Sequence, residues 1–294
     1  MRLQGSEDDR LLPSGICFIT KTILAYFLLR IQSKDWKLCY TYYHYEQKEG
    51  RFSMWGLIKR QFHEINWKDL VPTTFILLIS WSDAPFTYAI GVQGSHFTTN
   101  MGMLLMYEVC IGLVVPMLIY HRFGSTLSLI PLAASVCFAI MGFSNNLILL
   151  ALLLLLPLFL LIIQMPSMDF QNTFGLITFG LLLMFTVSVA CAYASLHFIS
   201  WEIISYLLPV MASTWFYLAP FFLQNVRQYK LKVTILALIL LIFILSRPLH
   251  LTIYLTIATI IATWFVMIAK ARQQQSLILY CLAQMVVIVL VYWS

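Results

Sequence analysis

Two acidic residues stand where a carboxyl group is unusual, inside long apolar runs of the chain. Asp83 lies in the segment SWSDAP and Glu108 in the segment MYEV. Ionisable groups inside a membrane are costly, and they commonly serve ions, protons or substrates. We therefore take Asp83 and Glu108 as candidate coupling or substrate-binding residues of a membrane protein.

The two carboxyl groups fall at similar depths on consecutive helical segments. At the helical rise of 1.5 Å per residue, both lie roughly 10 Å below the same membrane face. If they face each other, they could share a proton or bind a cation. The alternative is that each is hydrogen-bonded separately by neighbouring Ser, Tyr or Trp groups. Pro85 adds interest to Asp83, because a proline frees a backbone carbonyl in the preceding helical turn.

Three further polar residues are expected at the same outer face. They are His96 in a short connection, Glu202 at the start of an apolar run and Arg247 between two runs. Together they could line an outer vestibule above the carboxyl groups. The alternative is that each is an ordinary solvated loop residue.

The elements that position these residues are helices in lipid. The chain is 61% hydrophobic and 10% charged, with a mean hydropathy of +0.86, whereas a soluble domain carries roughly 25% charged residues. We expect an all-α, polytopic integral membrane protein, because each run approaches the length of about 20 residues that crosses a bilayer. The nine runs are residues 70–92, 101–120, 125–144, 146–165, 174–199, 202–222, 231–246, 248–269 and 276–293.

The basic residues predict which ends of these runs face the cytoplasm. If residues 1–69 are cytoplasmic, all of the 18 Lys and Arg residues except Arg247 fall on the cytoplasmic side. Basic residues are retained on that side during insertion. This split favours nine transmembrane helices, a cytoplasmic N-terminus and an outer C-terminus. It also explains the net charge of +6 without a nucleic-acid partner.

The first 69 residues differ from the rest of the chain. Residues 1–53 are basic and aromatic-rich, and we expect them to be cytoplasmic or interfacial. Residues 54–69 are predicted to form an amphipathic interfacial helix, since Trp55, Ile58 and Phe62 recur at helical spacing among charged residues. Residues 70–294 then form a single transmembrane helical domain.

Five prolines punctuate the apolar runs, and they are candidate hinges: Pro116, Pro131, Pro157, Pro209 and Pro220. The chain has no Walker A loop, no HExxH and no GxSxG motif, and its six cysteines form no CxxC pair. The motifs therefore indicate no catalytic residues, no metal site and no cofactor, and an enzyme is the less favoured class.

The amphipathic segment that begins Met54-Trp55-Gly56 is similar to the elbow helix of permease subunits of ABC-type exporters. Such subunits usually have six spans and use an ATPase on a separate chain. The resemblance covers about 16 residues, and it implies a possible ATPase partner subunit.

These features favour a multi-pass permease, or a permease subunit, in the plasma membrane that transports a small or amphipathic substrate. Proton or cation coupling would then involve Asp83 and Glu108. Three alternatives remain: the permease subunit of an ATP-driven exporter, a membrane enzyme acting on lipid-linked substrates, and a non-catalytic sensor or assembly subunit. The sequence does not indicate an oligomeric state or a partner other than the lipid bilayer and the possible ATPase.

Overall fold

Every regular element in the described part of the chain is helical. The computed structural model describes residues 62–63, 65–93, 99–121, 123–165, 170–196, 198, 200–223, 228–248, 250–269 and 276–293, all within the compact unit Ile58–Ser294. The elements are α4 (Trp67–Gln93), α5 (Thr99–Tyr120), α6 (Leu129–Phe143), α7 (Leu147–Ile163), α8 (Thr173–Leu183), the π-helix η2 (Met184–Val189), α9 (Ala190–Leu196), α10 (Trp201–Phe222), α11 (Tyr229–Leu245), α12 (Leu251–Ala269) and α13 (Leu277–Tyr292). Two predictions lie outside the described residues, the N-terminal region 1–53 and most of the amphipathic segment 54–69.

The helices follow the predicted apolar runs closely. Because α8, η2 and α9 are continuous, each run corresponds to one helical rod in the described ranges. Four helices are long and apolar enough to cross a membrane, within Asn100–Tyr120, Thr173–Leu196, Trp201–Phe222 and Leu251–Ala269. Shorter apolar helices are α6, α7 and α13. The chain is thus an all-helical protein with several candidate membrane spans, and nine crossings stay a prediction.

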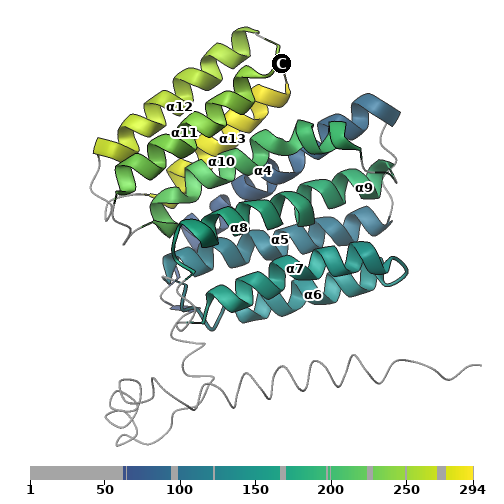
Figure 1. Ribbon diagram of the computed structural model, residues 1–294. Coiled ribbons are helices and arrows are strands. Elements are labelled where there is room, and N and C mark those ends of the chain that lie inside the picture. The colour runs from purple at the N-terminus through teal and green to yellow at the C-terminus, as the bar shows by residue number, and fades with distance from the viewer. Residues whose placement is uncertain are drawn as a thin grey trace, which may run out of the picture. The chain divides into compact units, whose positions relative to one another are not determined.

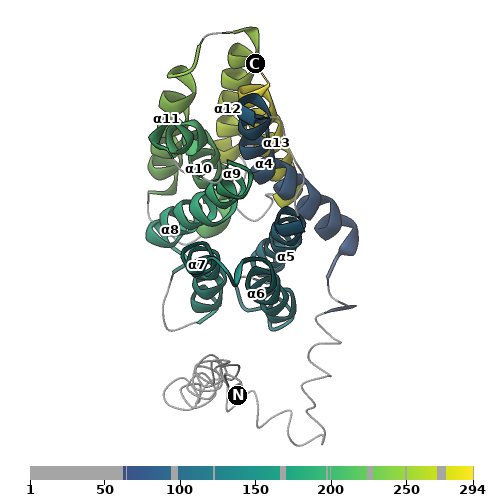
Figure 2. The ribbon, with the colours of Figure 1, turned by 90° about the vertical axis from the view of Figure 1, so that its right-hand side faces the viewer.

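The helices pack in two rows, which Figure 2 shows nearly end-on. One row runs α12, α13, α4, α5 and α6, and the other runs α11, α10, α8 and α7, with each helix contacting the next. The rows meet at both ends, where α11 contacts α12 and α6 contacts α7 (Figure 1). The segment η2–α9 lies between the rows, against α4 and α5. The centre of the bundle is therefore built by α4, α5, α9 and α10.

Two contacts between helix ends are compatible with the predicted assignment of those ends to the cytoplasmic face of the membrane. The ammonium of Lys232 donates to Oγ1 of Thr173 at 2.7 Å, which joins the start of α11 to the start of α8. Oγ of Ser128 donates to Oε1 of Gln164 at 3.2 Å, which joins the start of α6 to the end of α7. In the predicted topology all four residues lie near cytoplasmic ends. Lys232 thereby brings a positive charge to the start of α8.

At several prolines within the helices, the backbone carbonyl that the proline frees is contacted by a side chain of a neighbouring helix. A proline lacks the N–H that would bond the carbonyl four residues earlier, and in lipid a neighbouring side chain must satisfy that carbonyl. Two prolines follow this rule: Ser188 Oγ donates to the Trp81 carbonyl below Pro85 (3.2 Å), and Tyr107 Oη to the Leu153 carbonyl below Pro157 (2.8 Å). At Pro116, Oγ1 of Thr74 lies 3.2 Å from the freed carbonyl of Gly112 and 3.0 Å from that of Leu70, so its one hydrogen is divided between them. Each of these prolines therefore has a hydroxyl of a neighbouring helix at its freed carbonyl, and each contact involves α4 or α5.

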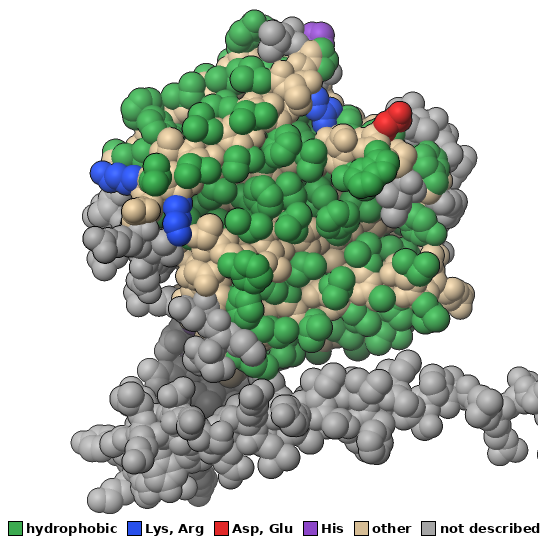
Figure 3. All heavy atoms as spheres, in the orientation of Figure 1, with side chains coloured by type: hydrophobic (Ala, Val, Ile, Leu, Met, Phe, Trp, Pro, Cys, Tyr) green, Lys and Arg blue, Asp and Glu red, His purple; other side chains and the backbone are tan. Residues whose placement is uncertain are grey.

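The surface of the bundle suits a hydrocarbon solvent. Figure 3 shows a face that is almost entirely hydrophobic, with the few visible charged side chains at its margins. Large apolar side chains project outward from many helices, among them Phe75, Met141, Ile148, Ile242 and Phe265. Exposed apolar area of this extent is unusual in a water-soluble monomer. It follows that the described unit is suited to a membrane, as the composition predicts.

Candidate functional site

Glu108 lies in the centre of the bundle, where α4, α5 and α9 meet. Its side chain is completely buried, and it is held by two neighbouring helices. Oε2 lies 2.7 Å from Oγ of Ser82 on α4, and Oε1 accepts the thiol of Cys191 on α9 at 3.0 Å. Both partners are neutral groups, so neither balances the charge of a carboxylate. We call Ser82, Glu108 and Cys191 the interior site.

Oγ of Ser82 contacts two acceptors, and its single hydrogen bears on the protonation of Glu108. Oγ of Ser82 lies 2.7 Å from the carbonyl of Leu78 and 2.7 Å from Oε2 of Glu108. A carbonyl can only accept, and a serine hydroxyl has a single hydrogen to donate. One hydrogen cannot serve both short contacts. Both are satisfied at once if Oε2 of Glu108 carries a proton and donates to Ser82, while Ser82 donates to Leu78.

The helix that supplies Cys191 has an irregular segment beside the interior site. Residues of η2, one turn before Cys191, follow a π-helical pattern, and π-helical turns are frequent at functional sites. Ser188 of η2 bonds the carbonyl of Trp81, next to Ser82. One buried polar atom here, Nε1 of Trp81, has no hydrogen-bond partner, and Oγ1 of Thr186 lies beside the hydroxyl of Tyr107. The core around Glu108 therefore has spare hydrogen-bonding capacity.

Asp83 belongs to a different part of the molecule, although it follows Ser82 directly. Successive residues of an α-helix point about 100° apart, so Asp83 turns from α5 toward α13. Oδ1 accepts the indole N–H of Trp293 at 3.2 Å. Oδ2 is buried and has no hydrogen-bond partner. Asp83 is thus bound to the end of the chain.

Arg247 lies with Asp83 in a second polar group, which we call the outer cluster: Asp83, Tyr88, Tyr206, Arg247, Tyr292 and Trp293. The guanidinium of Arg247 is 4.4 Å from the ring centroid of Tyr206 and 5.2 Å from that of Tyr292. The carbonyl of Tyr206 accepts Nη2 of Arg247 at 2.6 Å and the hydroxyl of Tyr292 at 2.5 Å. These contacts join α10, α13 and the segment after α11. Tyr206 lies in α10 three residues before Pro209, which is inside the same helix.

The predicted site residues therefore fall into separate places. Asp83 and Arg247 both act electrostatically on Tyr206 and Tyr292, in the outer cluster. Glu108 has different partners, and no hydrogen bond in the described part of the chain joins it to Asp83. Glu202 is exposed in the first turn of α10. His96 lies outside the described residues.

Several residues of these sites were not singled out for function from the sequence. Ser82 and Cys191 look like ordinary helix residues, and Tyr292 and Trp293 fit the general pattern of interfacial aromatic residues. One signal was available: Pro85 predicted a free carbonyl, and the structure supplies Ser188 as its donor. The partner of a buried carboxyl cannot be found in this way, because it depends on how the helices are rotated.

Comparisons with other proteins give no information about the site, so its geometry is the only guide to its chemistry. No protein-family model, no curated protein and no solved structure matches the chain. Within the described ranges, no group of three or more His, Cys, Asp or Glu side chains could hold a metal ion. The chemistry that the interior site offers is the binding of a proton or a small cation by one carboxyl group between three helices.

Proposed function

We propose that this chain is a proton-coupled carrier in which Glu108 is the coupling residue. The observation that carries the proposal is a completely buried carboxyl group held between α4, α5 and α9, whose neighbour Ser82 divides its hydroxyl between Oε2 of Glu108 and the carbonyl of Leu78. Intramembrane carboxyl groups of this kind serve proton relays in transporters. The nearby π-helical turn and the unpartnered indole N–H of Trp81 support a site that changes its bonding during a cycle.

The coupling step follows from the single hydrogen of Ser82. With Glu108 protonated, Ser82 is free to donate to the carbonyl of Leu78, one turn earlier on α4. When the proton leaves, the carboxylate takes the hydrogen of Ser82, and the carbonyl of Leu78 loses its side-chain partner. A proton on α5 would thereby change the bonding of α4. Such a local change can bias a packed helix between two arrangements.

The proposal includes the finer predictions of topology and location. We propose nine crossings with a cytoplasmic N-terminus, in the plasma membrane, and an outer mouth shaped by Arg247, Glu202 and His96. The contacts of Asp83 favour a role at this mouth, and a coupling role for Asp83 stays a prediction. The substrate is a small or amphipathic molecule.

The proton at Glu108 can be tested without knowing the substrate. A hydrophobic carbodiimide reacts with protonated carboxyl groups in apolar surroundings, and peptide mass spectrometry locates the adduct. We expect modification at Glu108 in the wild type and its loss in Glu108→Gln. The matched control is Glu202→Gln, the same change at an exposed carboxyl, which should leave the labelling of Glu108 unaltered. Absence of label at Glu108 over a whole pH series would contradict the proposal.

Coupled transport is the second test, made in proteoliposomes against a panel of small and amphipathic solutes. For a transported solute, the wild type and Glu202→Gln should show a solute-evoked proton current, whereas Glu108→Gln should show none. The Gln variant should still exchange labelled solute for unlabelled solute, because exchange needs no net proton movement. Proton current at the wild-type level in Glu108→Gln would exclude Glu108 as the coupling residue.

A third measurement addresses the energy source. The full chain is purified in mild detergent, and all co-purifying proteins are identified by mass spectrometry. A carrier driven by protons should purify without a nucleotide-binding chain. A stoichiometric ATPase subunit would contradict the proposal and would favour the permease subunit of an ATP-driven exporter.

A further inference from the structure

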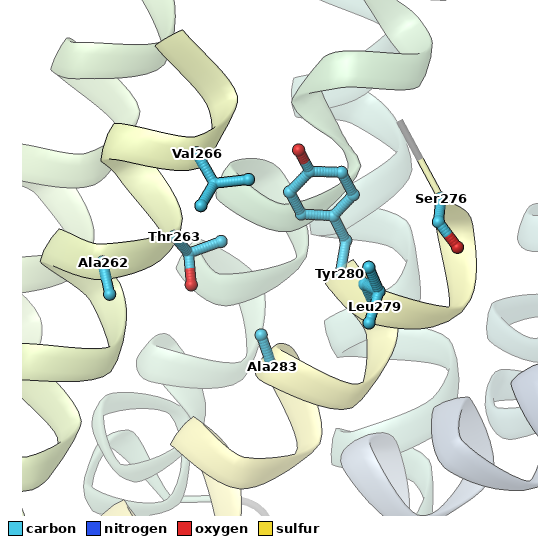
Figure 4. A pocket seen from close by; sticks show the side chains of 7 residues that line it. All are labelled: Ala262, Thr263, Val266, Ser276, Leu279, Tyr280 and Ala283. Carbon is cyan, nitrogen blue, oxygen red and sulfur yellow. The ribbon is translucent and has the colours of Figure 1, made fainter. Parts of the chain in front are cut away.

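A cavity opens between the last two helices, α12 and α13, far along the chain from Glu108. Its volume is about 220 Å³, and its lining is mostly apolar (Figure 4): Ala262, Thr263, Val266, Ser276, Leu279, Tyr280 and Ala283. Two residues of its rim are exposed on the surface of the bundle, Val266 at 43% and Leu279 at 57%. In a membrane this rim faces hydrocarbon, so the molecules that can reach the cavity sideways are lipids.

Tyr280 gives the cavity a polar feature. Its side chain is only 3% exposed, and it extends into the space between the two helices with its hydroxyl at the level of Val266 (Figure 4). That hydroxyl is buried and has no hydrogen-bond partner. A buried hydroxyl normally has a partner, so an unpaired one calls for an explanation, such as a ligand or a water.

Two further polar side chains lie near Tyr280. Gln284 lies one turn beyond Tyr280 on the same face of α13, and its Nε2 contacts Ser213 and Thr214 of α10 while Oε1 has no partner. Tyr217, one turn beyond Ser213 on α10, is completely buried, and its hydroxyl lies beside Thr263 of the cavity lining. The interior beside the cavity is therefore polar but uncharged.

The depth of Tyr280 fits the ester region of a phospholipid. Ser276 precedes the first turn of α13, and four residues of helix place Tyr280 about 6 Å further into the membrane. Tyrosine hydroxyls are commonly placed at this level, between hydrocarbon and water. Ala283 lies a further turn inward, so the apolar walls of the cavity extend toward the hydrocarbon core.

We infer that the α12–α13 cavity binds one bilayer phospholipid, with an acyl chain against its apolar walls and an ester carbonyl accepting the hydroxyl of Tyr280. The ester oxygen is the acceptor that Tyr280 lacks, and the lateral opening lets the chain pass from the bilayer. This site is separate from the interior site and does not rest on proton coupling. Its test therefore fails or succeeds independently of the function of Glu108.

The test uses the full chain, purified in detergent until annular lipid is removed and then titrated with palmitoyl-oleoyl phosphatidylcholine in native mass spectrometry. We expect a first lipid to bind the wild type more tightly than all later ones. Ala283→Leu fills the cavity and should weaken this first binding about tenfold, the effect of about 1.4 kcal/mol. Ala258→Leu is the matched control, because Ala258 is exposed on α12 and does not line the cavity. Equal first-lipid binding in Ala283→Leu and the wild type would overturn the proposal.

Tyr280→Phe keeps the test decisive if the leucine variant fails to fold. It removes only the hydroxyl, and we expect the first lipid to bind about fivefold more weakly, as for the loss of one neutral hydrogen bond. In lipid-free detergent the melting temperature should not fall, because the hydroxyl has no protein partner to lose. A lower melting temperature without lipid, together with unchanged lipid binding, would show that Tyr280 serves the protein core only.

Discussion

Glu108 and Asp83 are both acidic residues of apolar helices, but the structure gives them opposite surroundings. Glu108 is completely enclosed, and its partners are two small side chains from neighbouring helices. Asp83 is only partly buried, and it bonds the exposed indole of Trp293 at the end of the chain. Depth alone therefore does not define a functional carboxyl group. What distinguishes the two is the neighbours that the rotation of each helix selects.

The two regions also differ in what holds them. The interior site depends on hydroxyl and thiol groups at close helix contacts, where α9 is lined by buried Ala190, Ala192 and Ala194. Small residues let helix backbones approach closely in membranes. The outer cluster instead uses large aromatic rings around Arg247, a geometry in which a cation is stabilised by ring faces. In the predicted topology Arg247 is the one basic residue on the outer side, and these contacts give its charge partners within the protein.

The largest expected effect on stability is at the interior site. Glu108→Ala should lower the free energy of unfolding by about 3 kcal/mol, because it leaves a cavity and removes the partner of Ser82 and Cys191. Glu108→Gln should cost less than about 1 kcal/mol, since an amide can both donate to Ser82 and accept from Cys191. Thermal unfolding followed with a thiol-reactive dye measures this, because Cys110, Cys191 and Cys281 are buried.

The alanine change at Asp83 gives a direct comparison with Glu108→Ala. A shift of 1 kcal/mol corresponds to about 2–4 °C in melting temperature for a domain of this size class. Asp83→Ala should lower the melting temperature clearly less than Glu108→Ala. Equal losses would mean that the two carboxyl groups are equivalent structural groups, contrary to the distinction drawn above.

The next effect in size concerns Arg247. Arg247→Ala removes two ring contacts and a hydrogen bond, and it should cost about 2 kcal/mol. Arg247→Lys should recover about half of this loss, because an ammonium keeps the charge but lacks the planar guanidinium that lies over the rings. Melting temperatures of both variants, with Lys230→Ala as an exposed basic control on α11, test the prediction. A loss in Arg247→Ala no larger than in the control would exclude a stabilising outer cluster.

The sequence predicted the helical rods well, and physical reasons set the limit of that success. Apolar runs must be helical in lipid, and the nearly fused runs 125–144 and 146–165 separate where Asn146 caps α7 by accepting the N–H of Leu149 at 3.2 Å. The π-helical pattern of η2 could not be predicted, because the run 174–199 contains no proline that would mark an irregular turn. Such a distortion depends on packing against α4 and α7.

For the site, the sequence identified the right residue types but not their partners. Asp83 and Glu108 stand out by charge, and Pro85 by its missing N–H. Trp293 is far from Asp83 along the chain, and nothing local relates the two. Arg247 was predicted at the outer face from its position between two apolar runs. Its contacts with the rings of Tyr206 and Tyr292 could not be predicted, because these residues are distant along the chain.

A smaller effect is expected at the proline of α4, and it can be measured as a coupling. Ser188→Ala leaves the carbonyl of Trp81 without its donor and should cost about 1 kcal/mol. In a Pro85→Ala background the restored N–H of residue 85 can bond this carbonyl, so the same serine change should cost almost nothing. The double-mutant cycle therefore predicts a coupling of about 1 kcal/mol between residues on different helices. Additive costs would show that Ser188 does not replace the missing bond.

The smallest effect is expected for Asp83→Asn, and it tests the comparison of the two carboxyl groups most directly. An asparagine oxygen can still accept the indole N–H of Trp293, so stability should change by less than about 0.5 kcal/mol. If Asp83 serves only the outer cluster, proton-coupled transport should persist in Asp83→Asn while it is lost in Glu108→Gln. Loss of coupling in both variants would instead assign the proton to both carboxyl groups. In that case α4 and α5 would have to rotate during the cycle, because Asp83 and Glu108 have hydrogen-bond partners on different helices in this structure.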